Sequence, residues 1–137
     1  MKKRTTLVPE YGPLAGMRIV GTGSLIAMPF AATMMADFGA EVIQIERPGV
    51  GDTYRSFPPV VSTEKGSASS SWIQDARNRL SLTLELDLRD PDVKEIFLKL
   101  IAESDIYIEN MVWLEKLGMS AREREMIARE NFLRVLQ

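Results

Sequence analysis

Short apolar blocks alternate along the chain with longer amphipathic ones. Residues 17–23 form a short apolar run behind a turn rich in glycine and proline, which predicts a buried strand. Residues 27–38 carry apolar side chains at helical spacing, with Pro29 in the first turn and Gly39 directly after the last, so we expect a mostly buried helix that ends there. The apolar run Glu41–Glu46 follows at once and predicts a second strand, joined to the first by a right-handed parallel crossover.

The periodicity then disappears over some thirty residues before it returns. Residues 48–77 are rich in proline, glycine and serine and show almost no hydrophobic period, which predicts a long loop. Leucine alternates with polar residues over 80–87, as in a strand with one wet face near a sheet edge. A cap at Asp90 precedes an amphipathic helix over 92–103, and residues 105–109 predict one more short strand.

Strands and helices that alternate in this way predict a three-layer, Rossmann-like α/β fold on a parallel sheet of about four or five strands. Ligands of such sheets bind at the carboxyl ends of the strands. Beyond residue 110 we expect helices over 114–117 and 120–129, and the start of a strand over 133–136. The chain then divides into a strand–helix–strand unit over 10–47, a long loop over 48–77, a second strand–helix–strand unit over 78–110 and terminal helices over 111–137.

Composition narrows the chemistry more than it narrows the fold. The 137-residue chain contains neither cysteine nor histidine, which excludes disulfides, zinc–thiolate sites, histidine metal sites and the Ser-His-Asp and Cys-His mechanisms. Its 17 basic and 19 acidic side chains leave a formal charge of -2, too small to recruit nucleic acid or an anionic membrane surface. No apolar run is long enough to span a membrane. We therefore expect a soluble cytoplasmic protein without a metal ion, nucleic acid or membrane as partner.

The turn between the first strand and the first helix is a candidate ligand site. Gly21, Gly23 and Ile26 give the spacing G-x-G-x-x-I, and the missing third glycine argues against a dinucleotide fingerprint. Residues 24–27 still lead into a helix N-terminus, whose free amides attract anions or carbonyl oxygens. A tight turn without a ligand is the alternative interpretation.

Polar residues at the ends of the other strands supply further candidates. Arg47 directly follows Glu41–Glu46, where its guanidinium can bind a phosphate with two hydrogen bonds or can simply be solvated. Asn110 follows the strand over 105–109, where its amide can bond a pantetheine amide or a ribose hydroxyl, or cap the next helix. Further basic residues that would meet a polyphosphate if the long loop folds back are Arg55, Lys65, Arg77 and Arg79.

Acidic residues near strand and helix ends give no catalytic signal. None of them has a partner at a spacing that suggests general acid–base catalysis, so we attribute them to solvation and capping. These residues are Asp37, Glu46, Asp52 and Glu109.

Two longer blocks carry more specific motifs than these single residues. Residues 12–55 read GPLAGMRIVGTGSLIAMPFAATMMADFGAEVIQIERPGVGDTYR, and residues 78–110 read NRLSLTLELDLRDPDVKEIFLKLIAESDIYIEN. The first block resembles PL-x-G, an apolar strand, A-G-P with a small-residue helix, and L-G-A-x-V-I-K-I-E-x-P-x-x-G-D. The second resembles N-K-x-S-I-x-L-D-L-K, a helix and A-D-V-x-x-E-N. This is the opening pattern of the class III CoA-transferases, the family of carnitine and formyl-CoA transferases, so the chain resembles the N-terminal part of that family's large domain.

The resemblance implies a transferase that moves CoA between an acyl-CoA and a free carboxylic acid, through mixed-anhydride and thioester intermediates on an aspartate. CoA and acyl-CoA are then substrates, and no cofactor is bound permanently. By the same resemblance the residues that contact CoA are Leu25, Ile26 and Ala27 beside the thioester and acyl group, together with Arg47, Asn110 and Lys116. We add Arg79 to this set because of its positive charge.

The chain also departs from the family pattern. Met28 stands at the glycine of A-G-P, Gln44 stands at the lysine of V-I-K-I-E, and the loop after Asn110 is shorter and lacks its usual Pro-Gly, which bears on Lys116. The family's nucleophilic aspartate would lie a few dozen residues beyond Gln137. No catalytic residue is therefore assigned, and we expect the isolated chain to be inactive.

Two interpretations of function follow from these residues. Family members form interlocked dimers, which implies a homodimer or a complementing second chain for an enzyme segment. The alternative is a non-catalytic CoA- or nucleotide-binding module, such as a truncated paralogue.

Overall fold

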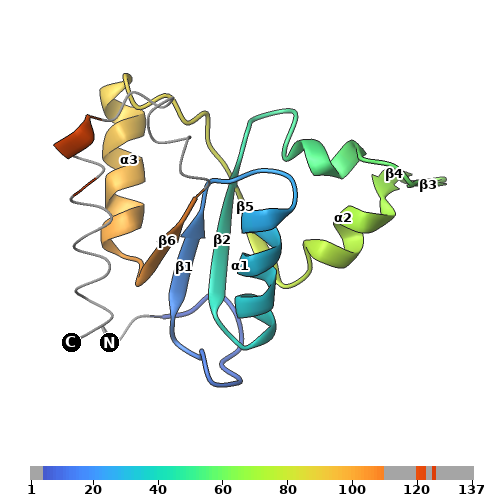
Figure 1. The fold of residues 1–137 in the computed structure, drawn as a ribbon, viewed down its shortest axis with the longest axis horizontal. Helices are drawn as coiled ribbons and strands as arrows, with labels where there is room; N and C mark the ends of the chain where they lie inside the picture. Colours follow the sequence, from blue (N-terminus) through green and yellow to red (C-terminus); the bar gives the residue numbers. More distant parts are fainter. Residues whose placement is uncertain (1–4, 110–119, 123–124, 126–137) are drawn as a thin grey trace.

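A parallel sheet of four strands forms the centre of the protein (Figure 1). The computed structural model describes residues 5–109, 120–122 and 125. The strands stand in the order β5-β2-β1-β6, and every neighbouring pair is parallel. Their bounds are β1 (Arg18–Gly21), β2 (Glu41–Glu46), β5 (Arg79–Thr83) and β6 (Ile106–Ile108). The parallel α/β fold expected from the sequence is confirmed.

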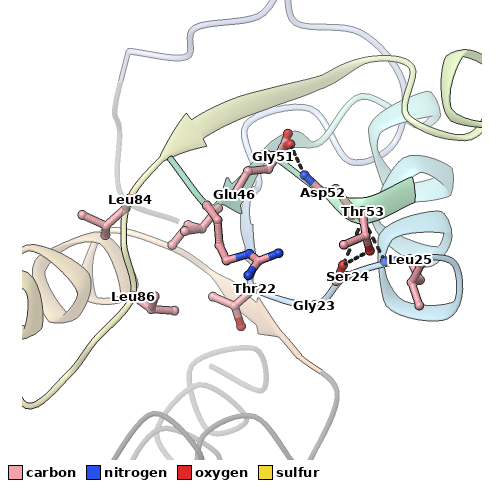
Figure 2. A pocket seen from close by; sticks show the side chains of 12 residues that line it. Thr22, Gly23, Ser24, Leu25, Glu46, Gly51, Asp52, Thr53, Leu84 and Leu86 are labelled. Atoms are coloured by element: carbon pink, nitrogen blue, oxygen red, sulfur yellow. Dashed lines mark hydrogen bonds between the residues drawn. The ribbon is translucent and has the colours of Figure 1, made fainter. Parts of the chain in front are cut away.

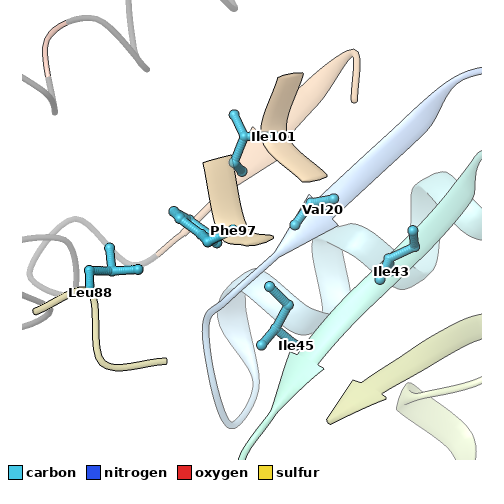
Figure 3. Close-up of a cluster of buried hydrophobic side chains, with 6 residues drawn as sticks. All are labelled: Val20, Ile43, Ile45, Leu88, Phe97 and Ile101. Carbon is cyan, nitrogen blue, oxygen red and sulfur yellow. The ribbon is translucent and has the colours of Figure 1, made fainter. Parts of the chain in front are cut away.

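Helices cover the two faces of the sheet. Ile19 and Val42 are fully buried in a cluster with apolar residues of α1 (Ala27–Asp37). The next residue of each strand points to the other face, because side chains alternate along a strand. There Val20 joins a second cluster around Phe97 of α3 (Pro91–Ala102) (Figure 3). Since β1 and β2 are buried on both faces, their apolar runs are continuous instead of alternating.

Local signals in the sequence set the ends of the two long helices. Gly39 follows α1 with φ +98°, and any Cβ there would collide with the carbonyl of Tyr11, so only glycine allows the chain to turn at this point. Asp90 caps α3 by accepting hydrogen bonds from the amides of Asp92 (2.9 Å) and Val93 (3.4 Å). The predicted helices over 27–38 and 92–103 are thus observed close to their expected bounds.

Residues 48–77 contain more regular structure than the long loop expected from their composition. They hold η1 (Thr53–Ser56), an antiparallel hairpin of β3 (Val60–Thr63) and β4 (Gly66–Ser69), and α2 (Ser70–Asp75). All of β3 and half of β4 are exposed. Neither strand therefore shows the alternation of apolar and polar residues from which a strand is predicted. The hairpin projects from the body of the protein (Figure 1).

The strand predicted over 80–87 is shorter than its leucine pattern. β5 ends at Thr83, which pairs with Glu46, the last residue of β2, so the sheet has no strand to pair with Leu84 onward. Leu84 and Leu86 instead pack against the cluster around Phe97. The elements expected over 114–117 and 133–136 lie outside the described residues, and so does most of 120–129.

Candidate functional site

A cavity of about 370 Å³ opens at the carboxyl ends of β1 and β2 (Figure 2). The segments that follow these two strands form its walls, and the leucines after β5 close one side. The parallel sheet therefore brings together residues that are far apart in the sequence, as expected for an open α/β sheet. The lining residues are Thr22, Gly23, Ser24, Leu25, Ile45, Glu46, Arg47, Gly51, Asp52, Thr53, Leu84 and Leu86.

The turn from β1 into α1 has an unusual backbone conformation. Leu25 adopts φ +69°, in the left-handed region that a branched side chain rarely occupies. Asp52 holds this conformation from the other wall, because its Oδ1 accepts hydrogen bonds from Ser24 Oγ (2.9 Å) and from the Leu25 amide (3.1 Å) (Figure 2). The same oxygen accepts a bond from the amide of Tyr54 at 2.9 Å. One carboxylate thus ties the loop after β2 to the turn after β1.

Glu46, the last residue of β2, fixes Asp52 in turn. Its carboxylate accepts the Asp52 amide at 2.8 Å and two bonds of 2.7 Å from the Arg55 guanidinium, and Ser81 Oγ donates to it at 2.8 Å. Burial alone would raise the pKa of Glu46, but these hydrogen bonds and the Arg55 charge outweigh burial and hold the pKa below its ordinary value. Glu46 is therefore an ionised residue of the cavity lining that holds the loop with Asp52 in place.

A second support reaches the turn from within the sheet. Gln44 Nε2 donates to the carbonyl of Gly23 at 2.6 Å, and Gln44 Oε1 accepts a bond of 3.1 Å from Arg79 Nη1. The Nε and Nη2 atoms of Arg79 are buried and have no hydrogen-bond partner among the described residues. Burial lowers the pKa of Arg79, and the nearby charges of Asp52 and Glu46 offset part of this effect.

Arg79 lines a separate, smaller cavity. This cavity has a volume of about 120 Å³ and lies between β5, β2 and α2. The ring of Trp72 contacts two guanidinium groups there, with its centroid 4.3 Å from Arg55 Cζ and 5.3 Å from Arg79 Cζ. Cation–π contacts at these distances are attractive and hold both arginines against α2.

The structure brings together only part of the set of residues expected to contact CoA. Leu25 and Arg47 line the same cavity, from the segments that follow β1 and β2. Ile26 caps α1 and Ala27 begins it, next to Leu25 but outside the lining. Arg79 lies in the smaller cavity. Asn110 and Lys116 lie outside the described residues.

The group of basic residues expected around a folded-back loop does not gather at the site. Arg55 is paired with Glu46, and Arg77 Nη2 forms an ion pair of 2.5 Å with Asp37. Both arginines therefore stabilise the fold locally, and Arg47 carries the positive charge on the lining of the larger cavity.

Asp52 and Glu46 are the residues whose part in the site the sequence did not reveal. Each was attributed to capping or solvation, and Asp52 does cap η1. Its contact with Leu25 joins positions 27 residues apart in the sequence, and no local spacing predicts such a contact. The available signal was the position of both acids near the carboxyl end of a buried strand, where ligand sites of α/β sheets form.

This arrangement can bind an elongated ligand that is anionic at one end. Arg47 offers a cation, the start of α1 offers backbone amides without partners inside the helix, and leucines provide an apolar wall. Within residues 5–109 and the few described beyond them, no three acidic side chains converge as a metal site would require. No helix in the described part of the chain combines the length and the apolar character needed to cross a membrane.

Comparison with known proteins gives consistent matches over most of the chain. Residues 14–130 match CoA-transferase family III. The Succinyl-CoA--L-malate CoA-transferase alpha subunit of Chloroflexus aurantiacus is 45% identical over 113 residues, which are 81% of this chain and 26% of that protein. Succinyl-CoA:glutarate CoA-transferase of Homo sapiens is 36% identical over 119 residues, or 85% of this chain and 26% of that protein.

Solved structures give the same result for the fold. A CAIB/BAIF family protein from Brucella suis superposes with a TM-score of 0.70 at 29% sequence identity, over 86% of this chain and 31% of that one. A hypothetical protein (Rv3272) from Mycobacterium tuberculosis gives 0.67 at 28% identity, over 85% of this chain and 31% of that one. The chain spans about a quarter of the length of the curated relatives.

Proposed function

Because the chain belongs to CoA-transferase family III, we propose that the protein moves CoA from an acyl-CoA to a free carboxylic acid, and that this chain carries part of the CoA site. The similar enzymes from Chloroflexus aurantiacus and Homo sapiens are named for succinyl-CoA as donor. Succinyl-CoA is therefore the donor that we propose for this protein, with a carboxylic acid as acceptor.

The cavity that joins Leu25 to Arg47 is the observation that supports this proposal. CoA has phosphates at one end and a thiol or thioester at the other, and the lining of the cavity includes both the cation Arg47 and apolar side chains such as Leu25. In our proposal Arg47 binds a phosphate, because its guanidinium can donate two parallel hydrogen bonds to phosphate oxygens. The thioester carbonyl meets the start of α1, where the amides of Ile26 and Ala27 are available, and the Leu25 side chain contacts the acyl group.

The remaining contacts extend beyond this cavity. We assign Asn110 and Lys116 to the CoA contacts by family resemblance. Arg79 joins them through its buried, unpartnered Nε and Nη2 atoms, which a ligand oxygen entering the smaller cavity would satisfy.

The chemistry itself is proposed for a longer protein or an assembly. An aspartate outside residues 1–137 attacks the acyl-CoA thioester to form a mixed anhydride and release CoA thiolate. The thiolate returns to form an aspartyl-CoA thioester and free acid, and the acceptor acid then takes the CoA by the reverse steps. A homodimer or a complementing chain would supply the rest of the site, and the isolated chain would bind CoA without turnover.

Titration calorimetry with CoA tests the binding part of this proposal. Arg47→Ala should weaken CoA binding about tenfold or more, since a charge-assisted bond contributes about 1.5–3 kcal/mol. Arg47→Lys should recover only part of the loss, because an ammonium group cannot donate bidentately. Arg89→Ala is the matched control: Arg89 is exposed, pairs with Asp87 and does not line the cavity, so this variant should bind CoA like the wild type. Equal affinity in all four proteins would contradict the site, and no CoA binding by the wild type would contradict the function.

A further inference from the structure

Asp52 is a buried carboxylate that touches the turn from which CoA would be bound. Only 4% of its surface is exposed. Its Oδ1 accepts three hydrogen bonds, of which two come from Ser24 and Leu25, while Oδ2 is buried without a partner among the described residues. Burying a carboxylate costs free energy, and the cost is higher when one of its oxygens accepts no hydrogen bond. Packing alone therefore does not explain an aspartate at this position.

The start of α1 lacks a cap of its own. Its N-cap residue is Ile26, which has no side chain able to accept a hydrogen bond from the first turn. Asp52 compensates from a different segment, because its negative charge lies beside the positive end of the helix dipole. Its Oδ1 also accepts a hydrogen bond from the Leu25 amide. The first amides that can donate to a ligand are therefore those of Ile26 and Ala27.

The charge at this position also selects what can bind beside it. A helix start ordinarily attracts phosphates or carboxylates. Here the carboxylate of Asp52 already lies at the helix start, and it would repel a second anion. A neutral group with a carbonyl oxygen, such as a thioester, meets no such repulsion.

We propose that Asp52 is a positioning residue of the CoA site, which holds Leu25 in its left-handed conformation so that the turn from Gly23 to Ile26 receives the neutral thioester end of CoA. This inference rests on the proposed function, since it concerns how that site is built. Asp52 does not touch the reacting atoms and acts through the backbone of Leu25.

Two probes of different length test this role by calorimetry. CoA reaches both ends of the site, whereas adenosine 3′,5′-bisphosphate lacks the pantetheine arm and occupies only the phosphate end. Asp52→Ala should raise the Kd of CoA about tenfold, as expected for the loss of about 1.4 kcal/mol, and leave the Kd of adenosine 3′,5′-bisphosphate within about twofold. Asp52→Asn keeps an acceptor oxygen for Leu25 and should recover most of the CoA affinity.

Asp105→Ala provides the matched control for Asp52→Ala. Asp105 accepts the Arg18 amide at 2.8 Å at the amino end of β1, the opposite end of the strand from the cavity. This variant makes the same chemical change at a distant carboxylate, so it should bind both probes like the wild type. If Asp52→Ala weakened both probes alike, or neither, Asp52 would be only structural and the proposal would be wrong.

Amide hydrogen exchange gives a readout that needs no ligand. In the wild type the Leu25 amide is bonded to a buried carboxylate and should exchange slowly, and in Asp52→Ala it should exchange at least about tenfold faster than in the wild type. Amides of β2 should keep their protection, which shows that the protein is still folded. Unchanged exchange at Leu25 would refute the positioning role even where CoA binds, whereas failure of the wild type to bind CoA with this exchange pattern intact would refute only the proposed function.

Discussion

Glu46→Gln removes one charge from the centre of the site without changing the size of the side chain. In the wild type the Glu46 side chain is 3% exposed and accepts four hydrogen bonds, two of them from the Arg55 guanidinium. Each carboxylate oxygen accepts two of these bonds, so a glutamine keeps one oxygen and turns its NH2 group toward two donors. The substitution therefore breaks a buried ion pair and opposes two donors at once.

The cost can be estimated from the burial of the two partners. Breaking a buried ion pair costs about 3–5 kcal/mol. Water screens this pair in part, because the Arg55 side chain is 40% exposed, so we expect the lower end of the range, about 3 kcal/mol. With a urea m-value of about 2 kcal/mol/M, the midpoint of unfolding should fall by about 1.5 M.

Urea unfolding followed by circular dichroism measures this shift, and Glu95→Gln is its matched control. Glu95 forms an ion pair of 2.6 Å with Lys99 on the outside of α3, where both side chains are well exposed. The same substitution there should leave the midpoint within experimental error, since exposed pairs contribute little. Equal midpoints for Glu46→Gln and Glu95→Gln would refute the view that Glu46 anchors the site.

Two further predictions concern pH and the core. Hydrogen bonds and the Arg55 charge hold the pKa of folded Glu46 below its ordinary value of 4.5. The stabilisation by Glu46 is therefore complete above pH 4.5 and is lost as the pH falls through the lower pKa of the folded protein. The difference in unfolding free energy between the wild type and Glu46→Gln should shrink over that range, and a difference that stays constant down to pH 3 would contradict this. Phe97→Ala should lose about 4 kcal/mol in urea unfolding, because Phe97 is fully buried and packs edge-on against Tyr107 at 5.7 Å between ring centroids, while Leu98→Ala, at a position 39% exposed, should lose far less.

The elements that the sequence predicted well are those whose side chains are buried by the sheet. β2 and α1 carry apolar residues because each packs against a neighbour, and burial imposes the period of the element on the sequence. The β3–β4 hairpin was missed for the opposite reason. Its strands pair with each other through the backbone while most of their side chains face water. Exposed side chains need no apolar alternation, so the sequence shows none.

The candidate site was likewise predictable only in part from the sequence. Leu25 and Arg47 could be placed at one edge of the sheet because Leu25 lies in the turn after the first strand and Arg47 directly follows the second, and parallel strands bring those ends together. The pairing of Asp52 with the turn could not, since it depends on how η1 folds back over β2. Arg79 begins β5 and therefore lies toward the other end of that strand, where its guanidinium contacts the ring of Trp72 in α2.

Glu46 and Asp52 both line the cavity that we propose for an anionic ligand, and the charges around them explain how this is possible. Glu46 is neutralised by two hydrogen bonds from Arg55, and the buried charge of Asp52 is balanced by the start of α1 and by nearby Arg79. The two acids and these two arginines cancel in formal charge, and Arg47 is the remaining cation among the described residues that line the cavity. In the proposed site the two acids fix the backbone that receives the neutral end of CoA, and Arg47 offers its charge to the phosphates from among the described lining residues. In Glu46→Gln the phosphate end should therefore retain its affinity even as the fold loses stability.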